Sequence, residues 1–127
     1  MSVPVALARV VVPDLEAVLP LYVALAGGGE PRRFAFRGIE LARIGPFLLL
    51  AGTPETLAPF RDRVATVLVD DVHATAALIV QGGGSVVDGP DAGPNGQRLV
   101  ARHPDGAIFE YIETRSAEPT GAAPDGP

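Results

Sequence analysis

Short apolar runs and segments of helical spacing alternate along the first half of the chain. The β-branched stretch from Val3 to Val12 predicts a strand, which Pro13-Asp14 ends, with Asp14 as the N-cap of the next helix. Pro20 should weaken that helix, and Gly27 to Gly29 should end it. Its apolar face is predicted at Leu15, Val18, Leu19, Tyr22 and Leu25. Three strands are predicted to follow, at 33–36, 39–44 and 47–51.

The second half repeats this order after a polar, proline-containing crossover at 53–62. The pattern predicts a strand at 63–69, a helix at 72–81, an irregular Gly- and Pro-rich loop at 88–96, and strands at 85–87, 97–102 and 107–113. Each half is therefore β-α-β-β-β. One such unit leaves a sheet face bare, whereas two paired units bury those faces around a shared concavity. We expect an α+β protein with a pocket between its halves.

The repeat also sets the expected domain organisation. We expect a single domain over residues 1–114, with modules at about 3–52 and about 63–114 and a linker at 53–62. The Pro-, Gly- and Ala-rich residues 115–127 are expected to form a flexible tail.

Composition narrows the class of protein. The 127 residues are enough for one core, and 47% apolar with 20% charged residues is typical of a soluble globular protein. The lack of cysteine excludes disulfides and thiolate metal sites, and the net charge of −5 argues against a nucleic-acid partner. The longest apolar stretch, 17–26, is too short to span a bilayer, and the start lacks a signal-peptide pattern. We expect a cytoplasmic protein with no membrane partner.

Three features in order carry a resemblance to a known family. They are the doubled β-α-β-β-β order, the strand, Asp-Leu, helix and glycine opening at 10–29, and His103-Pro104-Asp105-Gly106 followed four residues later by Glu110. Over roughly residues 3–114 the chain resembles the vicinal oxygen chelate superfamily, which includes glyoxalase I, fosfomycin-resistance proteins, extradiol dioxygenases and bleomycin-resistance proteins. The resemblance implies tandem βαβββ modules that form an incomplete eight-stranded barrel, and a homodimer.

The resemblance also implies where a metal would lie. Metal-using members take one ligand from each of four strands, and the matching positions here are Leu7, Val64, Leu49 and Glu110. Leu49 is matched by aligning Gly45 with Gly106, and its two neighbours are equally inert. A lone carboxylate does not hold a divalent ion against water. The histidines, His73 at a helix start and His103 in a turn, are expected to be a solvated residue and a turn residue. We expect neither a metal nor another cofactor.

Strand alternation extends these positions into an expected binding surface, because residues two apart share a face. The expected ligand-binding residues are Leu7, Arg9, Phe47, Leu49, Val64, Thr66, Arg98, Arg102, Ile108 and Glu110. Few polar groups in an apolar concavity are typical of a small-molecule site. We therefore expect a small hydrophobic or amphipathic ligand.

Arg9 and Glu110 have two interpretations. They could form an internal ion pair that satisfies both charges, or they could contact a ligand directly. An unpaired, desolvated Glu110 would be suited to act as a general acid or base.

The leading prediction is a metal-independent binding protein of the glyoxalase/bleomycin-resistance class, with an antibiotic-like or natural-product ligand and no enzymatic activity. A 6% aromatic content without tryptophan leaves the ligand itself open. The alternatives are a metal-dependent enzyme (a glyoxalase-type lyase or isomerase, or an extradiol dioxygenase) and a metal-free enzyme with Glu110 as the catalytic residue. A scaffold or dimerisation module ranks last, because nothing in the sequence indicates a protein partner.

Overall fold

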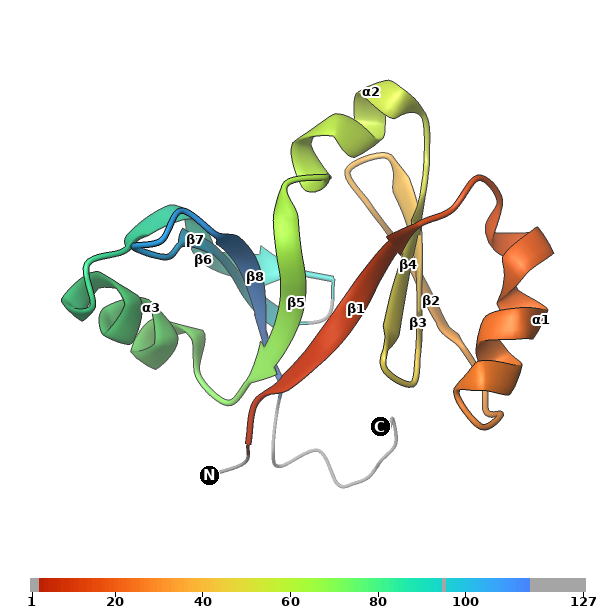
Figure 1. Cartoon of the computed structure of the whole chain (residues 1–127), viewed down its shortest axis with the longest axis horizontal. Coiled ribbons are helices and arrows are strands. Elements are labelled where there is room, and N and C mark those ends of the chain that lie inside the picture. The colour runs from red at the N-terminus through yellow and green to blue at the C-terminus, as the bar shows by residue number, and fades with distance from the viewer. Residues whose placement is uncertain (1–2, 95, 115–127) are drawn as a thin grey trace.

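The computed structural model describes residues 3–94 and 96–114, which form an α+β fold (Figure 1). The elements are β1 (Val5–Val11), α1 (Leu15–Leu25), β2 (Arg32–Phe36), β3 (Ile39–Ile44), β4 (Phe47–Ala51), α2 (Pro54–Leu57), the 3-10 turn η1 (Ala58–Phe60), β5 (Arg63–Val69), α3 (Val72–Gln81), β6 (Ser85–Gly93), β7 (Gly96–Arg102) and β8 (Ile108–Glu113). Two copies of β-α-β-β-β thus flank a short helical crossover, as the hydrophobic pattern predicts. We refer to β1–β4 with α1 as the first module and to β5–β8 with α3 as the second module.

Local sequence starts both long helices. The Asp14 side chain accepts a hydrogen bond from the backbone N–H of Glu16 at 3.0 Å. The Asp71 side chain accepts from the backbone N–H groups of His73 and Ala74 at 2.9 and 3.1 Å. These N-caps satisfy donors that the first helical turn leaves without a partner. The aspartate after the first strand of each module is therefore a structural part of the repeat.

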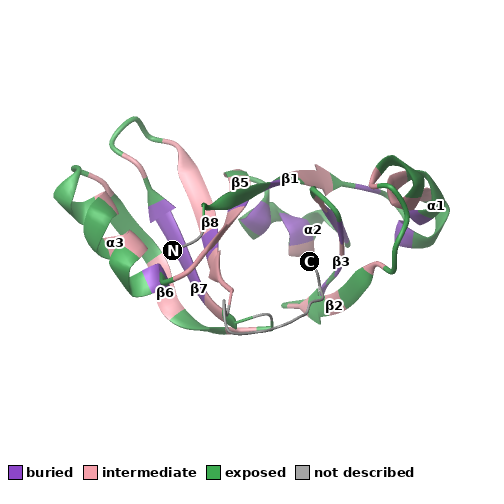
Figure 2. Cartoon of the chain, turned by 90° about the horizontal axis from the view of Figure 1, so that it is seen from below, coloured by how far each residue is buried: buried purple, intermediate pink, exposed green. Residues whose placement is uncertain are grey.

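The described strands form one mixed sheet in the order β2-β3-β4-β1-β5-β8-β7-β6. The first and last strands of each module pair in parallel, β1 with β4 and β5 with β8. The modules meet where β1 and β5 pair antiparallel, with Leu7 opposite Thr66. The sheet curls into a half-barrel, and α1 and α3 lie on its outer side (Figure 2).

Residue alternation divides the core between the two faces of the sheet. On the convex face, one cluster packs with α1 around Leu49 and another packs with α3 around Leu99. The concave face of the first module carries a third cluster, which consists of Leu7, Ile39, Leu41, Leu48, Leu50, Leu57 and Phe60. Each fully buried aliphatic side chain contributes about 1.5–3 kcal/mol. The concave face of this module is therefore an apolar wall, packed against Leu57 of α2 and Phe60 of η1.

The predicted elements match the observed ones closely, except after β6 begins. The loop predicted at 88–96 is wrong over most of its length, because β6 continues to Gly93 and pairs with β7. Its register shifts on both sides of Asp88, so no alternating pattern marks this part of the strand. The predicted tail at 115–127 lies outside the described residues. No helix in the described part of the chain is long and apolar enough to cross a membrane.

Candidate functional site

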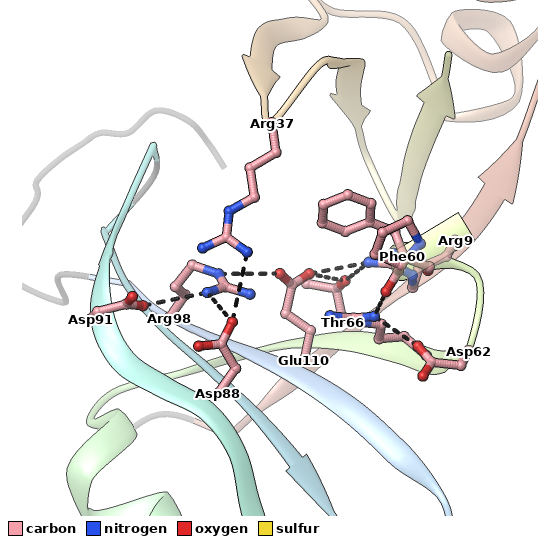
Figure 3. A network of polar contacts seen from close by, with 11 residues as sticks. Arg9, Arg37, Phe60, Asp62, Thr66, Asp88, Asp91, Arg98 and Glu110 are labelled. Atoms are coloured by element: carbon pink, nitrogen blue, oxygen red, sulfur yellow. Dashed lines mark hydrogen bonds and ion pairs between the residues drawn. The ribbon is translucent and has the colours of Figure 1, made fainter. Parts of the chain in front are cut away.

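A cluster of charged side chains lies on the concave face, where the two modules meet (Figure 3). Arg9 on β1 donates from Nη1 to Thr66 Oγ1 on β5 at 2.6 Å and to Glu110 Oε1 on β8 at 3.1 Å. The Thr66 hydroxyl also donates to Glu110 Oε1, at 2.9 Å. The Arg9 Nη2 atom donates to the backbone carbonyl of Phe60 at 2.9 Å. Three neighbouring strands therefore place these groups in one hydrogen-bonded network.

Burial sets the electrostatics of this network. The side chains of Arg9 and Glu110 are only 8% and 12% exposed. Burial lowers the pKa of Arg9, and the negative charge of Glu110 opposes this effect. The nearby charge of Arg63 lowers the pKa of Arg9 further. A buried charge is stable only when it is paired, so Arg9 and Glu110 depend on each other.

A second arginine, Arg98 on β7, extends the cluster into the second module. Its side chain is 1% exposed, and Nη1 donates to Asp88 Oδ2 at 3.1 Å and to Asp91 Oδ1 at 3.4 Å. The Arg98 Nε atom lies 3.8 Å from Glu110 Oε2, which is too far for a hydrogen bond. Within the described part of the chain, Nε and Nη2 of Arg98 are buried and have no hydrogen-bond partner. We call Arg9, Thr66, Asp88, Asp91, Arg98 and Glu110 the polar cluster.

The β2–β3 hairpin of the first module covers Arg98. The Phe36 ring centroid lies 5.2 Å from Arg98 Cζ. The next residue, Arg37, reaches Asp88 of β6, with Nη1 3.7 Å from Oδ2. Contacts from the hairpin to β6 and β7 therefore connect the two outer parts of the curled sheet.

Most of the residues predicted for the site share the concave face. Arg9, Thr66 and Glu110 are in contact, and Leu7 lies in the apolar cluster beside them. The predicted register of β7 agrees with the observed pairing, in which Arg102 lies opposite Ile108, while Val100 is opposite Glu110 and Arg98 is opposite Ile112. Ile108 is partly buried, whereas Arg102 is exposed. Whether these residues bind a ligand stays a prediction.

Leu49 and Phe47 lie on the opposite face from the one predicted. Both belong to the cluster beneath α1. Arg9 pairs with Leu48 in the first module, whereas Thr66 pairs with Glu110 in the second. Leu48 is thus the counterpart of Glu110, although Leu48 follows Gly45 by three residues and Glu110 follows Gly106 by four. A shift of one residue moves a strand's side chains to the other face.

Val64 also departs from its predicted place. It is 60% exposed, so it does not extend the buried concave surface. The pairing of β5 with β8 shifts between Arg63 and Thr66, and the shift puts Arg63 opposite Ile108. Arg63 lies over the Phe60 ring, with Cζ 5.4 Å from its centroid, and pairs with Asp62 at 2.7 Å. A β-bulge of this kind has no pattern of its own in the sequence.

Sequence reasoning missed Phe36, Phe60, Arg63, Asp88 and Asp91. Phe36 and Phe60 occupy predicted elements, but their ring contact at 6.1 Å joins segments far apart in the chain. Asp88 and Asp91 fall in the stretch that was expected to be irregular. Carboxylates three residues apart, ten and seven residues before a buried arginine, are not a recognisable motif. Only the strand pairing brings them together.

The histidines have the structural roles that were expected. His73 is exposed in the first turn of α3. His103 holds the turn before β8, where its backbone N–H donates to the Ala107 carbonyl at 2.8 Å. Its Nε2 lies 2.6 Å from the Tyr111 hydroxyl, and its ring stacks on Phe109 with centroids 4.4 Å apart.

The residues at this site do not fit the metal that the family resemblance implies. Glu110 Oε1 already accepts from the Arg9 guanidinium, whose charge would repel a cation. The related positions hold Leu7, Val64 and Leu48, which offer no donor atom. Among the described residues, no group of three or more His, Cys, Asp or Glu side chains could hold a metal ion. Catalytic zinc needs about three protein ligands.

Comparison with known proteins supports the fold. No protein-family model and no curated protein matches the chain. An uncharacterized protein from Methanosarcina mazei is 36% identical, with a TM-score of 0.84 over 93% of this chain and 98% of that chain. A methylmalonyl-CoA epimerase from Mycobacterium tuberculosis is 20% identical, with a TM-score of 0.66 over 86% and 87%. A hypothetical protein from Bacillus halodurans is 17% identical, with a TM-score of 0.61 over 94% and 100%.

Paired βαβββ modules in a curled eight-stranded sheet define the class of protein as one with a glyoxalase-like fold. This is the fold that the resemblance of its motifs to the vicinal oxygen chelate superfamily implies. The similarity to the epimerase extends to the fold alone.

Proposed function

We propose that the protein is a metal-independent small-molecule-binding protein whose ligand lies against the concave face. The observation that carries this proposal is the Arg9–Glu110 ion pair at 3.1 Å. The one carboxylate at a ligand position of the family is neutralised by a cation that the protein itself supplies. Beside this pair lies an apolar wall that includes Leu7, Leu48 and Leu50. A few polar groups against an apolar surface favour small-molecule recognition.

The proposal extends to the kind of ligand and to the assembly. A hydrophobic or amphipathic ligand of the natural-product or antibiotic type would suit the apolar wall. The family resemblance supports binding by a homodimer. The composition supports a cytoplasmic location.

Two measurements on the purified full chain test this function. Elemental analysis should give less than stoichiometric Zn, Ni, Fe and Mn. Calorimetric titration with a panel of hydrophobic antibiotics should give at least one ligand whose affinity is unchanged after treatment with a chelator. Stoichiometric metal together with loss of binding on chelation would overturn metal independence. No binding across the panel would overturn the binding function.

A metal-free acid–base enzyme is the second candidate. It is favoured by Glu110 Oε2, which accepts no hydrogen bond from the described residues. One positioned carboxylate accelerates a proton transfer by about 10²–10⁴-fold. In such an enzyme Glu110→Gln would abolish turnover of a bound ligand, whereas in a binding protein there would be no turnover to lose.

A further inference from the structure

The Arg98 guanidinium and the Glu110 carboxylate face each other in the polar cluster, and each has polar atoms without a hydrogen-bond partner among the described residues (Figure 3). Arg98 has two buried nitrogens, Nε and Nη2, without a hydrogen-bond partner in the described part of the chain. Their N–H groups project from one edge of the planar guanidinium, the edge suited to bidentate recognition. Opposite this edge lies Glu110 Oε2, 3.8 Å from Nε and likewise without a hydrogen bond from the described residues. Buried donors are normally satisfied, so the two Arg98 nitrogens require an explanation.

We propose that the Nε/Nη2 edge of Arg98 and the Oε2 atom of Glu110 bind an uncharged ligand group with an acceptor and a donor on the same side. A primary amide or a lactam is such a group. Its carbonyl oxygen accepts from Arg98, and its N–H donates to Glu110. This inference rests on the proposed function and names the chemistry recognised at that site.

The charge of the cluster selects against ions. With Arg37, which joins the cluster from the hairpin, three guanidinium groups, Arg9, Arg37 and Arg98, balance three carboxylates, Asp88, Asp91 and Glu110. A ligand carboxylate on Arg98 would lie close to Glu110 Oε2 and be repelled by it. A ligand ammonium on Glu110 would meet Arg9 and Arg98 in the same way. Burial without a compensating charge is costly, so a neutral hydrogen-bonding group fits best.

The short gap also selects the geometry of the ligand. The ligand's acceptor must reach Arg98 and its donor must reach Glu110, although Nε and Oε2 are only 3.8 Å apart. A lactam presents its carbonyl and N–H on one edge, whereas an ordinary secondary amide has a trans bond and points them in opposite directions. The two classes should therefore bind with different affinities. The apolar body of the ligand would extend toward Leu7 and Leu48 on the concave face.

Access to this pair depends on the β2–β3 hairpin. Arg98 is 1% exposed, whereas Glu110 is 12% exposed, so Glu110 is the side open to solvent. Phe36 packs over Arg98, and Arg37 pairs with Asp88. A ligand group that reaches Nη2 must move this hairpin away from β6 and β7.

The decisive test compares two probes that differ by one hydrogen-bond donor. The full chain is titrated with 2-quinolone, a bicyclic lactam, and with 1-methyl-2-quinolone, which has no N–H. We expect 2-quinolone to bind about tenfold or more tightly, because a hydrogen bond to a charged group is lost in the methylated compound. Quinoline-2-carboxylate, the anionic probe, should bind no better than the methylated compound. In ¹⁵N-resolved spectra, 2-quinolone should shift the Nε–H signal that is missing from the Arg98→Lys variant.

A matched pair of variants separates recognition from stability. Arg98→Lys should weaken 2-quinolone about tenfold and should also weaken 1-methyl-2-quinolone, because the methylated compound keeps the carbonyl that accepts from Arg98. Arg61→Lys, at an exposed arginine outside the cluster, should change neither. The proposal is overturned by equal affinity for the two quinolones in the wild-type chain, or by binding that leaves the Arg98 signal unmoved. If antibiotics of the panel bind but the quinolones show no preference, the inference fails and the binding function stands. If nothing in either set binds, both fail.

Discussion

The buried pair formed by Arg9 and Glu110 makes the sharpest prediction about stability. In Arg9→Met, the carboxylate of Glu110 keeps only the Thr66 hydroxyl as a hydrogen-bond donor, with 12% of its side chain exposed. In Glu110→Gln, the Arg9 charge stays 8% exposed without its counter-ion. Removal of one partner of a buried pair costs about 3–5 kcal/mol. For a domain of this size, each variant should unfold about 10 °C or more below the wild type.

The double variant Arg9→Met/Glu110→Gln should lose much less stability than the two single variants lose when their losses are added. Arg9→Met/Glu110→Gln leaves no unpaired charge, and the glutamine can still accept from Thr66. We expect a coupling free energy of about 2–3 kcal/mol, measured by urea denaturation of all four proteins at neutral pH. The exposed pair of Arg33 and Glu16, 44% and 70% exposed, serves as the control cycle and should show no measurable coupling. Additive single effects in the Arg9–Glu110 cycle would refute the reasoning.

Three further predictions follow from particular contacts. Leu48→Ala and Leu49→Ala should each destabilise the fold by about 2–5 kcal/mol in urea denaturation, but only Leu48→Ala should weaken ligand binding, because only Leu48 faces the concave side. Burial raises the pKa of Tyr111 in the folded protein above 10.0, its ordinary value. The stability that this shift contributes is therefore complete below the pKa of the unfolded chain, and it is lost as the pH rises through the pKa of the folded protein. In Tyr22→Phe, where Tyr111 is the sole tyrosine, an absorbance titration with a midpoint at or below 10.0 would contradict this. Arg37→Ala removes the ion pair to β6 and should raise the rate of ligand association in stopped-flow measurements; an unchanged rate would show that the hairpin does not limit access.

The secondary structure was largely predictable because its determinants are local. Asp14 and Asp71 start both long helices, and alternation of apolar residues marks the strands between them. Arg9, Thr66 and Glu110 were also identifiable, since each stands at a fixed spacing from the repeated motifs. Features that depend on the residues of a single strand, helix or motif can therefore be predicted from the sequence.

The remaining parts of the site depend on pairing between strands, which no single segment encodes. The spacing from Gly45 to the concave face is one residue shorter than that from Gly106, so Leu48 and not Leu49 lies on this face. The bulge in β5 exchanges Arg63 for Val64 in the same way. Asp88 and Asp91, the carboxylate partners of Arg98, lie on a strand with two register shifts. The sequence pattern therefore does not predict that they meet Arg98.

The seam between β1 and β5 has a consequence for the symmetry of the repeat. The repeat relates Arg9 to Thr66 and Leu48 to Glu110, so the two sides of the seam carry different residues at equivalent positions. Two identical half-length chains meeting along this seam would place arginine against arginine, or threonine against threonine. In this chain the Arg9–Glu110 pair forms once, because the equivalent positions hold Thr66 and Leu48. The two halves therefore differ at the polar cluster, although they keep the same order of strands and helix.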